Sequence, residues 1–356
     1  MEKTRRASII IVTHNGRHYL EACLASLQQE IGPCDELIVV DNASVDGSVD
    51  LVRQQRPDAI IIINSTNAGF AAACNTGASH AQGHYLVFLN QDTEVQPGWL
   101  DALLAALESD GEAALATSKQ LFLARSHRLH SAGADMHYSG LIFLRGVLQP
   151  ADEFIAGIER VQSAVGASFA MLRTVWRELG GFAPEFFMYY EEMDLSWRAQ
   201  LAGHVCLYTP ESVVYHDVPI STLSAIQLHY LCRNRLASLL VNWKWSTLLL
   251  LAPGLLLAEL AEFAFVAMAG RWQGVRMKIA AYGWLLRNLD TLRRLRGERY
   301  ALRRVPDWRI LENRTWTLEP RRFGGGKPGH LLARLVSLPL YANAWLAWHI
   351  CHSLGW

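Results

Sequence analysis

The chain has 356 residues, of which 51% are hydrophobic and 19% are charged. This composition excludes an intrinsically disordered protein, and the length suits one large domain or two. The formal net charge of zero hides an uneven distribution: residues 1–270 contain 17 Lys/Arg against 28 Asp/Glu, whereas residues 271–330 contain 15 against 5. An acidic body followed by a basic segment predicts a binding partner for that segment.

The cysteines and the N-terminal residues indicate a protein body that stays in the cytoplasm. None of the six cysteines forms a C-x-x-C pair, so neither a zinc site of that kind nor a redox dithiol is predicted. Cysteines scattered through a long chain are typical of reduced, buried thiols. The first apolar run, residues 9–12, is too short for the core of a signal peptide.

The first hundred residues alternate between short β-branched runs and longer helical patterns. Strands are predicted at residues 8–13, 36–41, 59–63 and 85–90, and helices near 18–29, 47–56, 70–82 and 97–108. The strands are almost continuously apolar, as is typical of parallel strands covered on both faces. The alternation predicts an α/β domain with a mostly parallel sheet, whose ligand binds at the polar carboxyl ends of the strands.

The middle of the chain is less regular. Residues 118–160 indicate hairpins or loops, and a strand-like pattern returns at 163–172. Residues 188–201 predict a helix, and residues 205–208 and 212–215 predict two short strands.

Two apolar stretches mark the C-terminal third. Residues 247–269 carry only Glu259 and Glu262 as charged side chains and are long enough to span a bilayer. The two glutamates and the Pro253-Gly254 pair favour instead a helix that packs against protein or lies in a membrane interface. Residues 331–354 form a second stretch, rich in Trp and His. The basic segment between them favours membrane contact, although a packed core or a subunit interface would also explain both stretches.

Six motifs follow one another between residues 7 and 235. They are IIIVTHNG, VVDNASVDGS, NAGFAAACNTG, FLNQDT, GGFAPEFFMYYEEMDLSWR and VVYH. Together they resemble the inverting family 2 glycosyltransferases with the GT-A fold, and within them the rhamnosyltransferase-like enzymes of bacterial polysaccharide assembly. The resemblance implies a GT-A glycosyltransferase domain over residues 1–235. It leaves residues 236–356 as a mainly helical, partly membrane-associated region.

The resemblance implies a binding site for a nucleoside-diphosphate sugar at the strand ends. Thr13 and Asp41 would contact the nucleobase. The other side chains that the family pattern assigns to the donor are Asn15, Asn67, Gly69, Phe70, Asn75, Asn90 and Arg198. Arg233-Asn234-Arg235 also resembles a basic motif that touches the diphosphate, and a helix surface is the alternative.

A divalent metal is expected at Asp92. A carboxylate at a strand end is well placed to hold such a cation together with a diphosphate, and a loop or capping residue is the plain alternative. Asn90-Gln91-Asp92 occupies the place of the family's Asp-x-Asp motif, so Asp92 becomes the main carboxylate ligand of Mg²⁺ or Mn²⁺. His216, in VVYH, matches a histidine that the family uses as a further ligand.

The acidic cluster Glu191-Glu192-x-Asp194 is the candidate catalytic base. It follows an aromatic run, and a carboxylate beside such a wall can have a raised pKa. The family pattern places the base at Glu192, where the usual residue is the shorter Asp, so Glu191 and Asp194 stay alternatives. Acids near a helix start also favour the helix dipole, which would need no catalytic role.

The sequence therefore predicts a metal-dependent inverting glycosyltransferase at the cytoplasmic face of a membrane. The expected donor is dTDP-rhamnose or a UDP-hexose, and the expected acceptor is a glycan or lipid-linked glycan of the cell surface. No nucleic-acid partner is expected, and the oligomeric state is left open. Two alternatives are an inactive glycosyltransferase-like scaffold and a nucleotidyltransferase, although THNGRHY lacks the Gly-rich phosphate loop of the latter.

Overall fold

The computed structural model describes residues 5–218, 224–268, 272–318 and 326–356. The chain divides into two compact units. The first consists of Met1–Ala134, Leu144–Ala199 and His204–Ile220, and the second of Asp135–Phe143, Gln200–Gly203 and Ser221–Trp356. Most of the second unit follows the end of the first in sequence.

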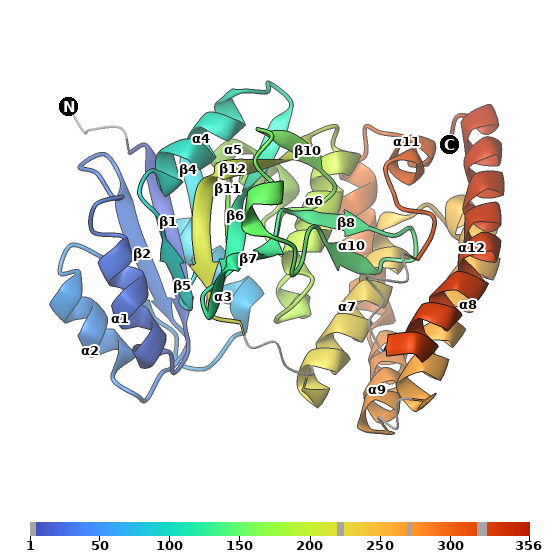
Figure 1. Ribbon diagram of the computed structural model, residues 1–356, viewed down its shortest axis with the longest axis horizontal. Coiled ribbons are helices and arrows are strands. Elements are labelled where there is room, and N and C mark those ends of the chain that lie inside the picture. Colours follow the sequence, from blue (N-terminus) through green and yellow to red (C-terminus); the bar gives the residue numbers. More distant parts are fainter. Residues whose placement is uncertain (1–4, 219–223, 269–271, 319–325) are drawn as a thin grey trace. The chain divides into compact units, whose positions relative to one another are not determined.

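The first unit is built on a ten-stranded mixed sheet (Figure 1). Its strands are β1 (Ala7–Thr13), β2 (Glu36–Asp41), β3 (Ile60–Ile63), β4 (Tyr85–Asn90), β5 (Thr93–Val95), β6 (Ala113–Phe122), β7 (Arg125–Ser131), β10 (Glu159–Val161), β11 (Ser168–Leu172) and β12 (Val205–His216). The order is β10-β12-β6-β11-β4-β1-β2-β3, with β5 on β12 and β7 on β6. Strands β4, β1, β2 and β3 are parallel, and so are β6 and β12, whereas β11 runs antiparallel between β4 and β6.

Helices cover both faces of the sheet because alternate residues of its central strands point to opposite sides. The helices of this unit are α1 (Arg17–Ser26), α2 (Ser48–Gln55), α3 (Phe70–His80), α4 (Trp99–Glu108), α5 (Arg173–Leu179) and α6 (Glu191–Leu201). Ile9 and Ile11 belong to the core shared with α1, α2 and α4. Ile10 lies under Gly77 of α3, on the other face. The predicted α/β domain with a mostly parallel sheet is confirmed.

The irregular middle segment holds more sheet than its sequence indicates. Strands β6 and β7 form a hairpin, and β8 (Ala134–Met136) pairs with β9 (Ile142–Leu144). The two short strands predicted at 205–208 and 212–215 are one strand, β12, whose pairing with β6 is interrupted between Thr209 and Val213. Pro210 lies in this interruption and has no backbone N–H to give to the ladder.

The second unit is helical apart from the residues of β8 and β9 that belong to it. Its helices are α7 (Ala225–Asn242), α8 (Trp245–Met268), α9 (Trp272–Arg287), α10 (Leu289–Leu302), α11 (Asp307–Glu312) and α12 (Gly326–Leu354). A capping box starts α7, because Ser224 accepts from the backbone N–H of Gln227 while the Gln227 side chain accepts from that of Ser224. The apolar stretches 247–269 and 331–354 fall on α8 and α12, apart from residue 269, which lies outside the described residues. Among those residues, only Trp245–Ala267 is long and apolar enough to cross a membrane.

Candidate active site

Thr13 and Asp41 end neighbouring parallel strands and lie opposite each other in the register of β1 and β2. Both side chains are buried. Asp41 Oδ2 accepts a hydrogen bond of 3.0 Å from the backbone N–H of Ser44. Thr13 Oγ1 and Asp41 Oδ1 have no hydrogen-bond partner among the described residues. Buried polar atoms of this kind are costly unless they are satisfied, so this corner of the sheet suits a polar ligand.

Asn15 holds the loop beside this corner. Its side-chain Oδ1 accepts from the backbone N–H of Val45 at 2.9 Å, and its own N–H donates to Ser44 Oγ at 2.9 Å. The φ of Asn15 is 50°, a left-handed conformation that Asn tolerates better than most residues. Its structural role is therefore to fix the loop after β2 against the loop after β1.

Gly69 lets the chain pass close to an aromatic ring at the start of α3. Its φ is +85°, and a Cβ at this position would lie 2.5 Å from Phe187 Cδ2. Its backbone N–H donates to Asn67 Oδ1 at 3.0 Å. The next residue, Phe70, is the first residue of α3, and it lines a pocket.

A pocket of about 280 Å³ collects five of the predicted site residues. Its lining consists of Phe70, Asn90, Val165, Gly166, Ala167, Met188, Tyr189, Glu191, Glu192 and His216. All of these belong to the first compact unit. The pocket therefore joins the carboxyl end of β4 with the end of β12 and the start of α6.

Glu191 and Glu192 are the two acids of the cluster that border this pocket. Burial raises the pKa of Glu192, and burial together with the charge of Glu192 raises the pKa of Glu191 well above its usual range. Glu192 Oε1 accepts from the backbone N–H of Gly166 at 3.2 Å, which fixes its carboxylate at the pocket wall. A carboxylate with a raised pKa at a pocket wall is suited to accept a proton from a bound hydroxyl.

Asp194 and Arg198 lie behind the pocket instead. Arg198 Nε donates to Asp194 Oδ2 at 2.8 Å, and the two side chains are almost completely buried. Arg198 also donates to the carbonyl of Leu179 at 2.6 Å. This ion pair anchors α6, so among the three acids Asp194 is already neutralised by a neighbour.

The turn before α6 is strained. Phe187 has φ 64° and ψ −63°, and the N–H of Met188 donates to the carbonyl of Phe186 at 2.7 Å, which makes a γ-turn of the rare positive-φ kind. Tyr189 and Tyr190 also have positive φ, at 63° and 78°. Such conformations persist only where surrounding contacts hold them, and they concentrate at functional sites. Here they present Met188 and Tyr189 to the pocket.

Asp92 and His216 form the candidate metal site. His216 Nε2 lies 3.3 Å from Asp92 Oδ1, and that oxygen makes no hydrogen bond within the described residues. Two ligands bound side by side to an octahedral ion at about 2.1 Å are about 3 Å apart, so this pair fits one shared divalent cation. The described residues hold no group of three His, Cys, Asp or Glu side chains that would enclose a metal. The remaining ligands would come from phosphate and water, as is usual for Mg²⁺.

His130 is a site neighbour that the sequence did not single out. Its ring packs edge-on against His216, with centroids 5.2 Å apart, and its Nδ1 lies 3.2 Å from Gln120 Oε1. Burial, with the nearby His216, lowers the pKa of His130 to about 3, so it stays neutral at physiological pH. Gln120 in turn donates to the carbonyl of Val165 at 3.1 Å. Only the pairing of β6 with β7 and β12 brings these residues together, so no local pattern announces them.

Two further residues that were predicted to contact the donor bond to protein groups in the structure. The Asn75 amide pairs with the backbone N–H and carbonyl of Phe182, both at 2.9 Å, and so positions the loop before α6. Arg235 lies in the second unit and pairs there with Glu259 and Glu262. Arg235 is therefore part of an ion-pair cluster inside the helical unit.

Comparison with known families identifies the chain. A model described as "Glycosyl transferase family 2" matches residues 8–141, and one described as "Glycosyl transferase family group 2" matches residues 85–272, more than half of the chain. The chain is a family 2 glycosyltransferase. The resemblance inferred from the six motifs is thereby confirmed, together with the GT-A type of fold.

Relatives of this glycosyltransferase include enzymes with named activities. It is 23% identical over 241 residues to N-acetylglucosaminyl-diphospho-decaprenol L-rhamnosyltransferase of Mycobacterium tuberculosis, a match that covers 60% of this chain and 76% of that protein. It is 30% identical over 113 residues to the uncharacterized glycosyltransferase YibD of Escherichia coli, covering 31% and 33% of the two chains. A solved structure of GalNAc-T7 with UDP, GalNAc and Mn²⁺ superposes with a TM-score of 0.57 at 18% identity, over 72% of this chain and 52% of that one. At this identity, the structural match supports the fold alone.

Proposed function

We propose that this glycosyltransferase transfers a sugar, with inversion, from a nucleoside-diphosphate donor to a hydroxyl of a lipid-linked glycan. The observation that carries the proposal is that Glu191 and Glu192 line the same pocket as Asn90 and His216. A carboxylate with a raised pKa faces the same space as the strand ends of the sheet. An acceptor hydroxyl and a donor diphosphate can therefore meet there.

The donor binds along the carboxyl ends of the strands. The unpaired atoms of Thr13 and Asp41 hold the polar edges of the base, and the Gly69 turn admits the ribose and diphosphate close to the backbone. Asp92 and His216 would hold the divalent cation, which neutralises charge on the leaving diphosphate when it is bound. The GalNAc-T7 structure with UDP and Mn²⁺ supports this part of the proposal through its similar fold.

Glu192 acts as the base. The acceptor hydroxyl gives its proton to the Glu192 carboxylate as its oxygen forms a bond to the anomeric carbon, and the bond from that carbon to the diphosphate oxygen breaks. Attack from the face opposite the diphosphate inverts the anomeric centre in one displacement, so no enzyme nucleophile is needed. The hydrogen bond from Gly166 orients the carboxylate during the transfer.

The named activity of the mycobacterial relative supports rhamnose as the sugar and a polyprenyl-diphosphate glycan as the acceptor. A lipid-linked acceptor would also place the enzyme at the cytoplasmic face of a membrane, in the synthesis of a cell-surface polysaccharide.

The test is a donor panel assayed with Mn²⁺ and with a polyprenyl-diphosphate N-acetylglucosamine acceptor. We expect acceptor-dependent release of nucleoside diphosphate, fastest with dTDP-rhamnose, and complete loss after chelation with EDTA. A preference for a UDP-hexose would overturn the assignment of the sugar. No release with any donor, from folded protein, would favour the inactive scaffold.

A further inference from the structure

Helix α8 exposes apolar side chains where a helix of a soluble protein would expose polar ones. Trp245, Leu249, Leu256 and Leu260 are 63%, 77%, 61% and 58% exposed. Their spacing of four, seven and four residues places them on one stripe of the helix. Four large apolar side chains on a single exposed stripe are more than the isolated surface leucines of an ordinary protein, and such a patch indicates a binding surface.

The charged side chains of α8 point the opposite way, into the helical unit. Glu262 Oε2 lies 2.7 Å from an Arg235 guanidinium nitrogen on α7 and 2.9 Å from Lys278 Nζ on α9. Glu259 pairs with the same Arg235 and lies 2.7 Å from Lys278 Nζ. Two carboxylates thus meet two cations inside the unit, and these charges do not interrupt the apolar stripe.

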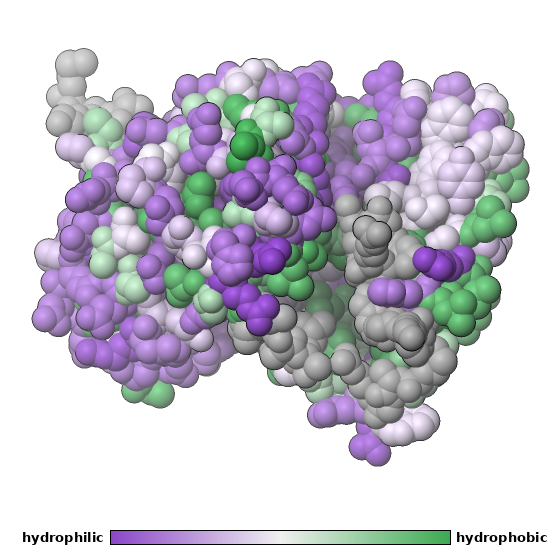
Figure 2. Space-filling model, in the orientation of Figure 1, coloured by the Kyte–Doolittle hydropathy of each residue, from purple (hydrophilic) through white to green (hydrophobic). Residues whose placement is uncertain are grey.

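Helix α12 packs against α8 and repeats the pattern. Leu331, Leu335, Leu338 and Leu346 are 60%, 65%, 74% and 53% exposed. Arg334 is the single Lys, Arg, Asp or Glu residue in the segment 331–354. Green, hydrophobic side chains gather at the surface around these two helices in Figure 2, whereas the surface around the first unit is mostly purple. We call the exposed stripes of α8 and α12 the leucine face.

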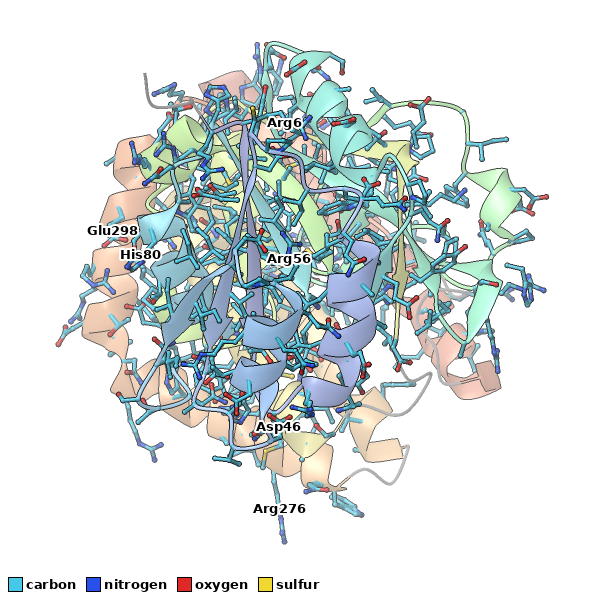
Figure 3. The ribbon with its side chains drawn as sticks, turned by 90° about the vertical axis from the view of Figure 1, so that its left-hand side faces the viewer. Arg6, Asp46, Arg56, His80, Arg276 and Glu298 are labelled. Atoms are coloured by element: carbon cyan, nitrogen blue, oxygen red, sulfur yellow. The ribbon has the colours of Figure 1, made fainter. Side chains whose placement is uncertain are left out.

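We propose that the leucine face lies on the surface of an anionic lipid bilayer. Charge complementarity favours lipid over a second copy of the chain, because residues 271–330 carry 15 Lys/Arg against 5 Asp/Glu. Lys278, Arg296, Arg299 and Arg314 are buried, but exposed arginines of the segment include Arg276, Arg287, Arg304 and Arg309. The exposed Arg276 projects away from α9, which packs against α8 (Figure 3). Trp245 and Trp345 lie on the leucine face, and tryptophan is enriched at the boundary between lipid chains and water.

The arrangement favours a helix lying in the interface over one that crosses the membrane. Helix α8 packs on α9, and its two glutamates pair with Arg235 of α7 and Lys278 of α9. A crossing α8 would have to carry these charges, or its own unpaired glutamates, into the hydrocarbon core at high cost. An interfacial helix pair needs only to bury its leucines to the depth of the headgroup boundary.

The experiment is flotation of the full chain with vesicles of phosphatidylglycerol and phosphatidylethanolamine, compared with vesicles of phosphatidylcholine alone. We expect flotation with the anionic vesicles, a weaker signal in high salt, and release by alkaline carbonate. The test variant is Leu249→Ser/Leu256→Ser/Leu338→Ser, for which we expect at least a tenfold lower bound fraction. The matched control is Ile63→Ser/Ile155→Ser, which removes two exposed isoleucines (56% and 66%) from the first unit and should leave flotation unchanged.

Circular dichroism and the urea midpoint establish that each variant is folded. Three results would overturn the proposal: full-length protein that does not float with anionic vesicles, a triple variant that floats as well as the wild type, or resistance to carbonate, which would indicate a spanning helix. Sedimentation velocity tests whether a second copy of the chain, instead of lipid, binds the leucine face. A wild-type dimer that the triple variant converts to a monomer, without flotation of either, would assign the leucine face to a second copy of the chain.

Discussion

At the scale of single residues, two neighbouring carboxylates border one small pocket and differ in what surrounds them. Glu192 receives a backbone hydrogen bond from Gly166, and Glu191 is the more buried of the two. Adjacent carboxylates in a buried site do not readily ionise together, so a proton held on one leaves the other as the base. Glu192 is our choice for the base because its carboxylate is oriented by the pocket backbone.

Replacing Glu192 by Gln should lower kcat by about 10²-fold or more, the usual scale for a lost general base. The KM for the donor should change little, because the proposed mechanism places this side chain at the acceptor. Steady-state kinetics with the preferred donor measures both constants. Asp194→Asn serves as the comparison. Loss of the Asp194 carboxylate breaks its ion pair with Arg198 and should lower the stability of the protein more than it lowers kcat. A larger kcat defect in Glu191→Gln would move the base to that residue.

The pH dependence should report the environment of the pair. Burial raises the pKa of Glu192, and a base works only when it is deprotonated, so kcat should rise with pH through a value above the ordinary range of Glu. The charge of Glu192 raises the pKa of Glu191, so Glu191 still holds its proton when Glu192 ionises. Glu191→Gln therefore removes no negative charge at this step, and the acidic limb should keep its position. Rate profiles from acidic to neutral pH test this expectation. A limb that moves to lower pH in Glu191→Gln would show that Glu191 is the acid that ionises first.

Asp92 and His216 should control the affinity for the metal. Asp92→Ala removes the carboxylate that faces His216 at 3.3 Å, and we expect Mn²⁺ affinity in the presence of the nucleoside diphosphate of the preferred donor to fall by about tenfold or more. Electron paramagnetic resonance of free Mn²⁺ measures this without turnover. Glu211→Ala, an exposed acid on the same strand as His216, should bind as the wild type does. Unchanged affinity in a folded Asp92→Ala protein would remove Asp92 from the metal site.

At the scale of secondary-structure elements, the site depends on how the start of α3 meets the turn before α6. The N–H of Ala71 donates to the carbonyl of Phe187 at 3.2 Å, and the Phe187 ring lies over Gly69. This contact holds a strained γ-turn in place. The γ-turn then sets the position of Met188 and Tyr189. Bulk added at Gly69 therefore acts on the pocket through the backbone.

Gly69→Ala should destabilise the protein by about 1–3 kcal/mol more than a glycine replacement without a clash, because its Cβ would meet Phe187. Gly98→Ala is the comparison: its φ of +83° is close to the +85° of Gly69, and no atom lies within 4 Å of the added Cβ. Its ψ is 2°, against 166° at Gly69, so only Gly69 has the extended positive-φ conformation that side chains other than glycine avoid. The difference between their free energies of unfolding in urea therefore measures the clash together with this backbone strain. Equal losses would show that the turn accommodates both without cost.

Local patterns predicted those elements whose periodicity is strong. Strands β2 and β4 match the predicted residues 36–41 and 85–90 because each is a continuous apolar run that ends in a polar residue. No periodic pattern in the sequence predicted the contacts between distant segments. Asn75 meets Phe182, and His130 meets His216, only after the sheet has formed. Motif order singled out Glu192, which lines the pocket, and also Arg198, which is buried on α6 in an ion pair with Asp194.

At the scale of the whole molecule, each unit is held together differently. The first has a continuous apolar core between sheet and helices. In the second, four charged side chains tie α7, α8 and α9 together, with Lys278 only 2% exposed between Glu259 and Glu262. Such a cluster contributes little over an apolar core when it is complete, but losing one member leaves a buried charge without compensation.

Lys278→Met should therefore destabilise the helical unit by about 3 kcal/mol, because two glutamates would share only Arg235. The side chains are similar in length, so the lost charge and not a cavity dominates the effect. Arg276→Met, an exposed position on the same helix, is the control and should stay within about 0.5 kcal/mol of the wild type. Urea unfolding followed by far-ultraviolet circular dichroism measures both. Arg235 and Lys278 hold the pKa of Glu259 at about 2 in the wild type, so Glu259 takes up a proton at a higher pH in Lys278→Met. The difference in the free energy of unfolding between Lys278→Met and the wild type should therefore narrow as the pH falls toward 2. A difference that stays constant with pH would mean that Lys278 stabilises the unit by packing and not by charge.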